Sequence, residues 1–211
     1  MSLLRQIEVG LSKFPFSVDP SFPVPLERYL KLLLHWNKTY NLTGIRDSNQ
    51  MISHHLMDSL SLVPYIDGSR IVDVGTGAGL PGIPLALYFR EKHFTLVDSN
   101  GKKVRFLTQA KIELELENVT VVHSRVESFD DKFDQVVCRA FASLDNLAKS
   151  CAHAVETDGT LLAMKAGGHE SLSENSELEI VSRLSVTVPL LDEERVLVIM
   201  RQRASGALNN L

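Results

Sequence analysis

The chain has little cysteine and no long apolar run. Cys138 and Cys151 are the two cysteines among 211 residues, too few for a disulfide framework or a zinc site. No run of apolar residues approaches the length of a membrane span. Near the start of the chain, Arg5 and Glu8 interrupt the apolar core that a signal peptide would need. We therefore expect a cytoplasmic protein with no membrane partner.

The chain also lacks an excess of positive charge. Its formal net charge is −4, from 22 Lys and Arg against 26 Asp and Glu. An acidic protein has no overall field that attracts nucleic acid, so any polyanion must meet a local basic patch. A hydrophobic fraction of 44% in 211 residues is ordinary for a globular protein, and it predicts one domain that buries a sizeable core.

The first third of the sequence has helical periodicity. The apolar spacing predicts helices over 2–12, 26–42 and 48–66, with Ser48 as the N-cap of the last. Four prolines in 14–25 indicate a connection. We expect residues 1–66 to form an extension that packs on the substrate side of a core over 67–203. Residues 204–211 are predicted to be a flexible tail.

After Gly68 the sequence pattern changes, and short β-rich segments alternate with helical ones. The predicted strands are 70–75, 93–99, 119–124, 133–140 and 159–166, and the predicted helices are 84–89, 102–117, 143–155 and 173–181. A closing antiparallel pair is expected at 183–190 and 194–202. This pattern predicts a doubly wound α/β fold: a mostly parallel seven-stranded sheet with helices on both faces. Ligands of such sheets bind at the carboxyl ends of the strands.

A glycine-rich turn, "DVGTGAGLPG", follows the first predicted strand, and it fits two cofactor patterns. Gly77, Gly79 and Gly82 match G-x-G-x-x-G, the dinucleotide fingerprint. In the other register, Asp73, Gly75, Gly77 and Gly79 match D-x-G-x-G-x-G, which resembles the first motif of S-adenosylmethionine-dependent methyltransferases. The second register is favoured because it begins where the strand ends.

The chemistry of the turn favours the same cofactor. Pro81 and Pro84 remove two backbone N–H groups from the helix start, where a pyrophosphate would bind. S-adenosylmethionine carries no phosphate, and its cationic groups suit a nearby carboxylate such as Asp73. Asp98, at the end of the second predicted strand, can accept both ribose hydroxyls, although a dinucleotide would also use it. Val126 and Glu127 either border the adenine or form an ordinary surface loop.

The group that receives the methyl is inferred from the end of the fourth predicted strand, "VVCRAFAS". The Asn/Asp-Pro-Pro-aromatic element typical of enzymes that methylate exocyclic base amines is absent. Cys138 is better explained as a packed core residue than as a nucleophile. Because no general base stands out, a guanine ring nitrogen 7 fits, since it needs no deprotonation. Arg139 is the candidate catalytic residue, contacting guanine O6 or a phosphate; alternatively it forms a structural ion pair with a carboxylate of the N-terminal region.

Six segments in order resemble the glucose-inhibited division protein B family. They are "WNKTYNLTGIRD", "HHLMDSL", "VDVGTGAGLPGIPLAL", "FTLVDSNGKKVRFL", "SRVESF" and "CRAFASL", within residues 26–165. The resemblance implies a Rossmann-like class I S-adenosylmethionine-dependent fold. It also implies methylation of guanine 527 at N7 in 16S rRNA, free or in the small ribosomal subunit. We expect a monomer that binds no DNA.

The resemblance also implies site residues. Cofactor contacts fall on Gly75, Leu80, Val126, Glu127 and Arg139. RNA contacts fall on Lys102, Arg125, Arg139 and Lys165. Apart from the resemblance, Lys102 and Arg125 are preferred to Lys103 and Arg105 because they lie nearer the ends of the predicted strands. The sequence departs from the family pattern at His54, Ala78 and Cys138, where relatives often have arginine, proline and serine. His55 and Asp58 could belong to a metal site, but we favour a polar helix face that packs toward the substrate, and no metal is expected.

Three other functions remain open. The first is a small-molecule methyltransferase, which predicts a closed apolar pocket with no basic rim. The second is an NAD-dependent oxidoreductase, which predicts stabilisation by NAD(H) and not by S-adenosylmethionine. The third is a non-catalytic RNA-binding module that keeps the fold.

Overall fold

The computed structural model describes residues 1–139, 143–168 and 170–204. The predicted tail from residue 205 onward and part of the "CRAFAS" segment lie outside the described residues. The helices are α1 (Leu3–Leu11), α2 (Pro23–Tyr40), α3 (Ser48–Met51), α4 (Asp58–Leu60), α5 (Gly82–Tyr88), α6 (Gly101–Glu113) and α7 (Leu144–Cys151). A π-helical segment, Ile52–Met57, joins α3 to α4 and is called the π segment below. Short 3-10 turns cover Val63–Tyr65, Val126–Ser128 and Ala152–Ala154.

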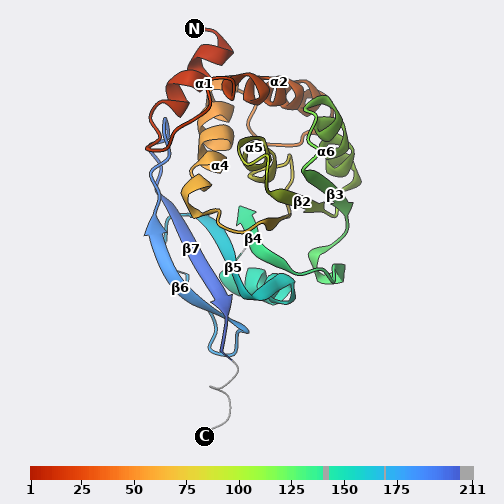
Figure 1. The fold of residues 1–211 in the computed structure, drawn as a ribbon, viewed down its shortest axis with the longest axis vertical. Coiled ribbons are helices and arrows are strands. Elements are labelled where there is room, and N and C mark those ends of the chain that lie inside the picture. Colours follow the sequence, from red (N-terminus) through yellow and green to blue (C-terminus); the bar gives the residue numbers. More distant parts are fainter. Residues whose placement is uncertain (140–142, 169, 205–211) are drawn as a thin grey trace, which may run out of the picture.

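The strands form one seven-stranded sheet in the order β3-β2-β1-β4-β5-β7-β6 (Figure 1). They are β1 (Arg70–Val74), β2 (His93–Asp98), β3 (Val119–His123), β4 (Phe133–Arg139), β5 (Val155–Ala166), β6 (Leu178–Ser185) and β7 (Arg195–Gln202). β1 to β5 pair in parallel, and β7 pairs antiparallel with both β5 and β6. The strand order reverses between β1 and β4, so ligands are expected at the carboxyl ends of these two strands. The predicted fold is confirmed.

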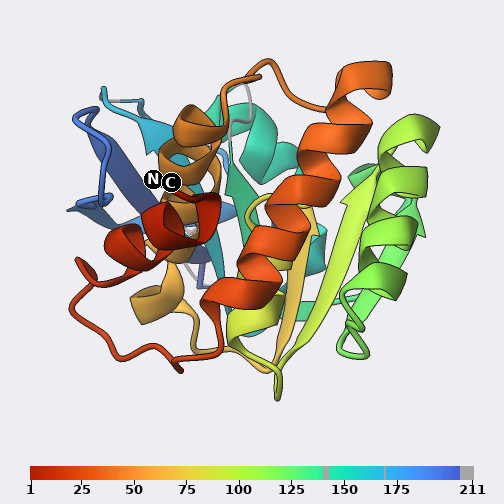
Figure 2. The ribbon, with the colours of Figure 1, turned by 90° about the horizontal axis from the view of Figure 1, so that it is seen from above.

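Helices cover both faces of the sheet. α1, α2, α4, α5 and α6 lie on one face and α7 on the other (Figure 1). Seen from above, α2 crosses its face of the sheet with α6 beside it (Figure 2). The larger hydrophobic core lies on this side and joins Leu26 and Leu30 of α2 to Ile71 and Phe94 of the strands. The smaller core packs α7 against the opposite face.

α2 is fixed to the glycine turn and to α6 by aromatic side chains. The buried Tyr29 hydroxyl donates a hydrogen bond to the Ala78 carbonyl of the glycine turn at 2.8 Å. Trp36 packs edge-on against Phe106 of α6, with ring centroids 5.7 Å apart. α2 begins at Pro23, inside the segment predicted to be a connection, because proline is tolerated in the first turn of a helix.

The predicted helix over 173–181 is wrong. Residues 173–177 form turns, and β6 begins at Leu178, which is buried in the smaller core. The strand predicted over 183–190 is therefore displaced, since β6 ends at Ser185. The polar composition of this stretch resembles an exposed helix, but pairing with β7 overrides that local preference. The antiparallel closing pair itself is confirmed.

The helix predicted over 48–66 is interrupted. It consists of α3, the π segment, α4 and a final 3-10 turn. Its N-cap is Asp47, whose carboxylate accepts the Gln50 N–H at 2.9 Å, and not Ser48. In the second half of the chain, the helix predicted over 143–155 ends as α7 at Cys151, and β5 begins at Val155 rather than at residue 159.

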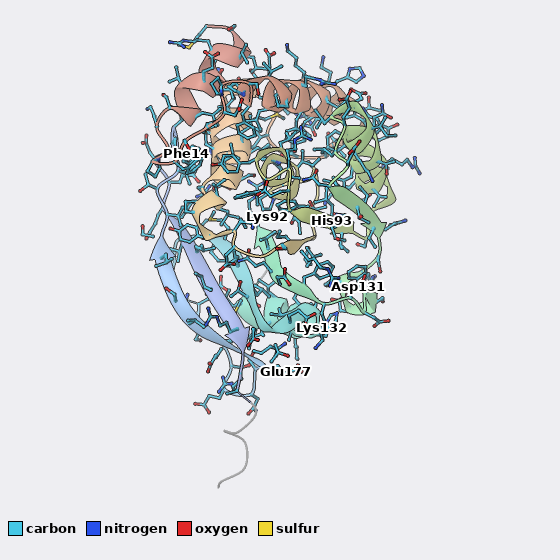
Figure 3. The ribbon with its side chains drawn as sticks, in the orientation of Figure 1. Phe14, Lys92, His93, Asp131, Lys132 and Glu177 are labelled. Carbon is cyan, nitrogen blue, oxygen red and sulfur yellow. The ribbon has the colours of Figure 1, made fainter. Side chains whose placement is uncertain are left out.

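At the amino-terminal ends of the strands, local contacts join the loops that precede them. Lys92 and His93 lie at the start of β2, and Lys132 lies just before β4 (Figure 3). The Lys92 ammonium donates to the carbonyls of Asp67 and Gly68. None of the predicted site residues lies at this edge, so the chemistry is expected at the opposite one.

Candidate functional site

The glycine turn leaves β1 through three left-handed residues. Gly75, Gly77 and Gly79 have φ values of +65°, +62° and +87°. Residues with a side chain rarely adopt this conformation, which accounts for glycine at every second position. The turn is held to β2, because the Gly75 N–H donates to the Val97 carbonyl at 2.9 Å. The three glycines of the predicted D-x-G-x-G-x-G pattern therefore correspond to a defined backbone conformation.

Asp73 lies beneath this turn. Its side chain is fully buried, and Oδ2 accepts hydrogen bonds from the Thr76 hydroxyl at 2.6 Å and the Gly82 N–H at 2.7 Å. Burial raises the pKa of Asp73 to about 6, against the lowering effect of these two hydrogen bonds. The carboxylate therefore ties the two ends of the turn together. Its predicted contact with the cofactor's cation remains a prediction.

The start of α5 packs too closely for a side chain at Gly82. A Cβ there would lie 2.2 Å from Leu96 Cδ2 and 2.7 Å from Asp73 Oδ2. A Cβ at Gly79 would lie 2.4 Å from Ile83 Cδ1. These two glycines let α5 approach β2 and α6, as the third glycine of nucleotide-binding turns does for helix and strand.

Asp98 ends β2 and connects it to the glycine turn. Its Oδ2 accepts the Gly77 N–H at 2.9 Å, and its Oδ1 accepts the Asn100 N–H at 2.8 Å. The Lys103 ammonium lies 3.6 Å from Oδ2. Each carboxylate oxygen has a second lone pair, so Asp98 keeps the capacity to accept from a ligand.

A cavity of ≈ 410 Å³ opens at the carboxyl ends of β1, β2 and β4; we call it the first cavity. Its lining includes Gly75, Asp98, Val126, Glu127 and Arg139 from the predicted cofactor site. The remaining lining residues are Val74, Val97, Ser99, Lys103, Ser124 and Arg125. Five of the nine predicted cofactor residues are therefore brought together. The other four, Asp73, Gly77, Gly79 and Leu80, build the turn and do not line this cavity.

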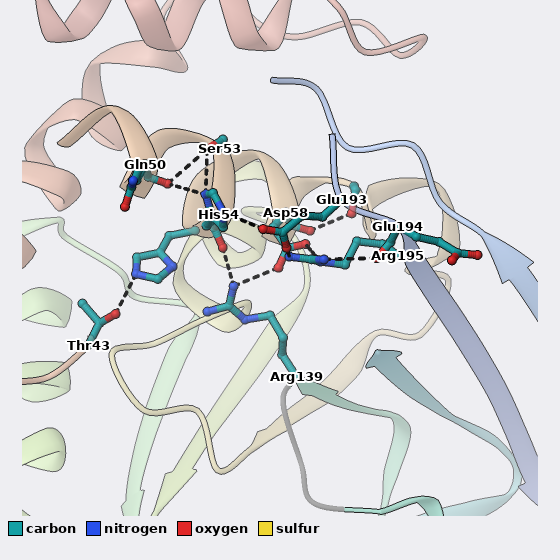
Figure 4. A network of polar contacts seen from close by, with 11 residues as sticks. Thr43, Gln50, Ser53, His54, Asp58, Arg139, Glu193, Glu194 and Arg195 are labelled. Carbon is teal, nitrogen blue, oxygen red and sulfur yellow. Dashed lines mark hydrogen bonds and ion pairs between the residues drawn. The ribbon is translucent and has the colours of Figure 1, made fainter. Parts of the chain in front are cut away.

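Arg139, at the end of β4, is held by the N-terminal region (Figure 4). Its Nη1 donates to the His54 carbonyl at 2.6 Å and to Asp58 Oδ2 at 2.8 Å. Asp58 is buried and accepts Arg195 Nε on its other oxygen at 2.9 Å. The structural ion pair considered for Arg139 thus exists. Both bonds use Nη1, so within the described part of the chain Nε and Nη2 have no recorded partner.

A second cavity, of ≈ 510 Å³, lies on the other side of Arg139, and we call it the second cavity. It is lined by Thr43, Ile45, His54, His55, Asp58, Arg139, Met164, Lys165, Ala166, Glu170 and Arg195. Arg139 lines both cavities and forms their common wall. The predicted polar face with His55 and Asp58 does face this space.

His55 in the second cavity is a neutral imidazole near pH 7. The residue is 5% exposed, and Nε2 lies 2.9 Å from the Thr43 hydroxyl. Burial, and then the nearby Arg139 guanidinium, lower the pKa of His55 to about 4. A group with so low a pKa is a weak base, although it can still form hydrogen bonds.

The residues predicted to contact RNA are spread along the edge of the sheet where the carboxyl ends of the strands lie. Lys165 lines the second cavity and pairs with Glu170 at 2.8 Å. Arg125 is exposed at the rim of the first cavity. Lys102 is exposed on α6 and lines neither cavity, whereas Lys103, the less favoured of the two, lines the first. Sequence reasoning missed Thr43, Arg195 and Glu170, which come together only through long-range packing.

The described residues form neither of two other candidate sites, a cysteine nucleophile and a metal site. Cys138 is 1% exposed in the sheet, as expected for a packed residue. Over the ranges that the structure covers, no three His, Cys, Asp or Glu side chains gather into a metal site. Over the same ranges, no helix combines the length and the apolar character needed to cross a membrane.

Solved structures show the same fold. A glycopeptide N-methyltransferase, MtfA, superposes with a TM-score of 0.57 at 12% sequence identity, over 70% of this chain and 95% of that one. A variant of MtNAS in complex with S-adenosylmethionine superposes with a TM-score of 0.57 at 12% identity, over 85% of this chain and 75% of that one. The fold is that of class I S-adenosylmethionine-dependent methyltransferases.

Sequence comparison defines the family. The model described as "GidB: rRNA small subunit methyltransferase G" matches residues 24–198. Ribosomal RNA small subunit methyltransferase G of Pseudomonas syringae pv. syringae is 42% identical over 95% of this chain and 95% of its own. That of Hydrogenovibrio crunogenus is 51% identical over 81% of each chain. The chain belongs to the GidB family of small-subunit rRNA methyltransferases, as its sequence segments indicated.

Proposed function

We propose that the protein transfers a methyl group from S-adenosylmethionine to ring nitrogen 7 of a guanine in 16S rRNA, at guanine 527. One observation carries the proposal: two cavities at the carboxyl edge of the sheet share the Arg139 wall. The first cavity suits the methyl donor and the second suits the base. A transfer reaction needs two such sites side by side, so that the reacting atoms meet.

The residues of the first cavity fit S-adenosylmethionine. Its ≈ 410 Å³ is within the range for sites that bind small molecules, roughly 300 to 1,000 Å³. Gly75 permits close approach of the ligand to the backbone, Asp98 accepts the ribose hydroxyls, and Val126 borders the adenine. When bound, S-adenosylmethionine supplies a methyl group on a cationic sulfur, which a lone pair can attack as a neutral thioether departs.

The charges of the second cavity favour an acceptor that loses no proton. Its carboxylates Asp58 and Glu170 are bound to basic side chains, and His55 is a weak base. Guanine N7 carries a free lone pair at neutral pH, and the product is a cationic 7-methylguanine. A general base is therefore not required, and alignment of the two reacting atoms is the main catalytic task.

Arg139 is the proposed catalytic contact. Its Nε and Nη2 are available to donate to guanine O6, the acceptor beside N7 on the same base edge. A hydrogen bond to O6 fixes the plane of the base relative to the methyl donor. Lys165, in the same cavity, is proposed to contact a flanking phosphate after exchanging its bond with Glu170, and His55 to bound the base.

Exposed cations at the rim are proposed to contact the rRNA backbone. Arg125 lies at the first cavity and Lys102 at the start of α6, on the same edge. With an overall charge of −4, such local contacts must supply the electrostatic attraction. The charged lining of the second cavity weighs against a small-molecule methyltransferase, for which a closed apolar pocket is expected.

Methyl transfer to ribosomal RNA tests the proposal directly. The purified protein is incubated with labelled S-adenosylmethionine and either naked 16S rRNA or small subunits that lack the modification, and nucleosides are then analysed. We expect label in 7-methylguanosine in at least one substrate. Arg139→Ala should abolish the signal, and Arg5→Ala, in an exposed ion pair of α1, should not. Binding of S-adenosylmethionine without label in either RNA would refute the proposed acceptor.

A further inference from the structure

We infer that Asp58 and the π segment are positioning elements that hold Arg139 between the two cavities. The inference rests on the proposed function for its catalytic consequence, although the geometry stands without it. Asp58 does not itself have to touch the RNA or the cofactor. It acts by fixing one nitrogen of the guanidinium and leaving the others for the ligand.

Asp58 is suited to this role by its burial and its two bonds. The residue is 2% exposed, and each carboxylate oxygen accepts from a different arginine (Figure 4). The bond to Arg139 Nη1 crosses 81 positions of sequence and joins the N-terminal region to β4. A charge-assisted hydrogen bond in such a buried place is strong and directional. The side chain of Arg139 is 18% exposed, so it is anchored but still reachable.

The π segment supplies the second anchor. In an α-helix the N–H of Asp58 would donate to the carbonyl four residues earlier, that of His54. Here the Asp58 N–H donates to the carbonyls of Ser53 and His55. The His54 carbonyl accepts Arg139 Nη1 at 2.6 Å. The wider turn therefore presents a backbone carbonyl and a carboxylate to the same nitrogen. Single π turns of this kind are frequent at functional sites.

The other partners of Asp58 show why its loss should act on Arg139. Arg195 is held a second time, because its Nη2 lies 3.0 Å from the Glu193 carboxylate. If the charge of Asp58 is removed, Arg195 keeps an anionic partner. Arg139 keeps the neutral carbonyl of His54 as its one hydrogen-bond partner among the described residues, together with a through-space attraction to the buried Asp73 that makes no hydrogen bond with it. Its orientation should therefore be the property that changes most.

The experiment compares Asp58→Asn with matched variants. Asparagine has nearly the same shape but carries no charge. We expect methyl transfer to rRNA to fall at least about tenfold in kcat, as when a buried charge pair loses one partner. The control is Glu193→Gln, which alters the exposed partner of Arg195 and should change kcat less than about twofold.

A double variant separates positioning from a general loss of structure. If Asp58 acts through Arg139, Asp58→Asn should add little to the defect of Arg139→Lys, so the two effects are strongly non-additive. Independent, multiplicative effects would overturn the inference, as would an unchanged kcat in Asp58→Asn. Should Asp58→Asn not fold, Asp58→Glu keeps the buried charge and shifts the carboxylate by one methylene, with the same expected loss.

A readout without catalysis keeps the inference apart from the proposed function. The side-chain Nε–H signal of Arg139, assigned by its absence from Arg139→Lys, is followed by NMR relaxation. We expect a rigid Nε–H in the wild type and a mobile one in Asp58→Asn. Equal mobility in both would overturn the positioning role. A wild type that methylates no RNA but shows this difference would refute the acceptor and leave the positioning role standing.

Discussion

The buried His55 should make the protein less stable in mild acid. The pKa of an exposed histidine is about 6.5, and burial together with Arg139 lowers that of His55 to about 4. Below pH 6.5 the unfolded chain therefore binds a proton at this site that the folded chain does not bind. The free energy of unfolding contributed by His55 is full above pH 6.5 and is lost progressively as pH falls toward 4.

The size of this effect follows from the two pKa values. With 6.5 in the unfolded state and about 4 in the folded state, the loss between pH 7 and pH 5 is about 2 kcal/mol. Asp73 acts in the opposite direction. Its pKa is raised from 3.8 to about 6, so the folded state binds the proton more tightly. Asp73 should therefore add about 1 kcal/mol over the same change of pH, which masks part of the His55 effect.

The assay isolates His55 by a difference between two proteins. Urea unfolding of the wild type and of His55→Gln is measured at pH 7 and pH 5, and the gap between their free energies is compared. We expect the gap to shift by about 2 kcal/mol in favour of the variant at pH 5. His35→Gln, on an exposed part of α2, is measured alongside as the same substitution at the surface. A constant gap for His55→Gln would refute the assignment of a neutral, buried imidazole.

Three further variants test other contacts. Tyr29→Phe leaves the Ala78 carbonyl without its hydrogen bond and should cost about 1 to 2 kcal/mol in urea unfolding, whereas Tyr40→Phe should cost little. Gly82→Ala places a Cβ 2.2 Å from Leu96 and should cost about 1 to 3 kcal/mol, with Gly44→Ala as a neutral control; equal stability of the two would contradict the packing described. Asp98→Asn should weaken binding of S-adenosylhomocysteine about tenfold by calorimetry, since both the proposed ribose contact and the Gly77 hydrogen bond suffer, and unchanged affinity would argue against the ribose role.

The sequence predicted the parts of the fold that depend on local pattern. The runs predicted as strands over 70–75 and 93–99 are β1 and β2, and the glycines after the first adopt left-handed conformations. The prediction failed where a segment's partner decides its structure. "SENSELEIV" has the polarity of an exposed helix, and it becomes a strand because β7 pairs with it.

Side-chain positions at the site were harder to predict. Lys103, and not Lys102, faces the first cavity, because α6 starts at Gly101 with Asn100 as its cap, which sets the direction of each side chain. The pairing of Arg139 with an N-terminal carboxylate was foreseen only as an alternative. Neither the choice of Asp58 nor the π segment that presents the His54 carbonyl carries a local sequence signal.

The larger core contains residues from both the first third and the middle of the chain, which has a consequence for folding during synthesis. Ile7, Leu26 and Met57 belong to the same core as Phe94 and Leu107. The N-terminal helices leave the ribosome first, before the strands that they cover have been translated. Short helices are marginal in water without a surface to pack on. The first third of this protein must therefore remain with its apolar faces exposed until β2 and α6 have been synthesised. Only then can the early helices and the later strands and helices pack into one core.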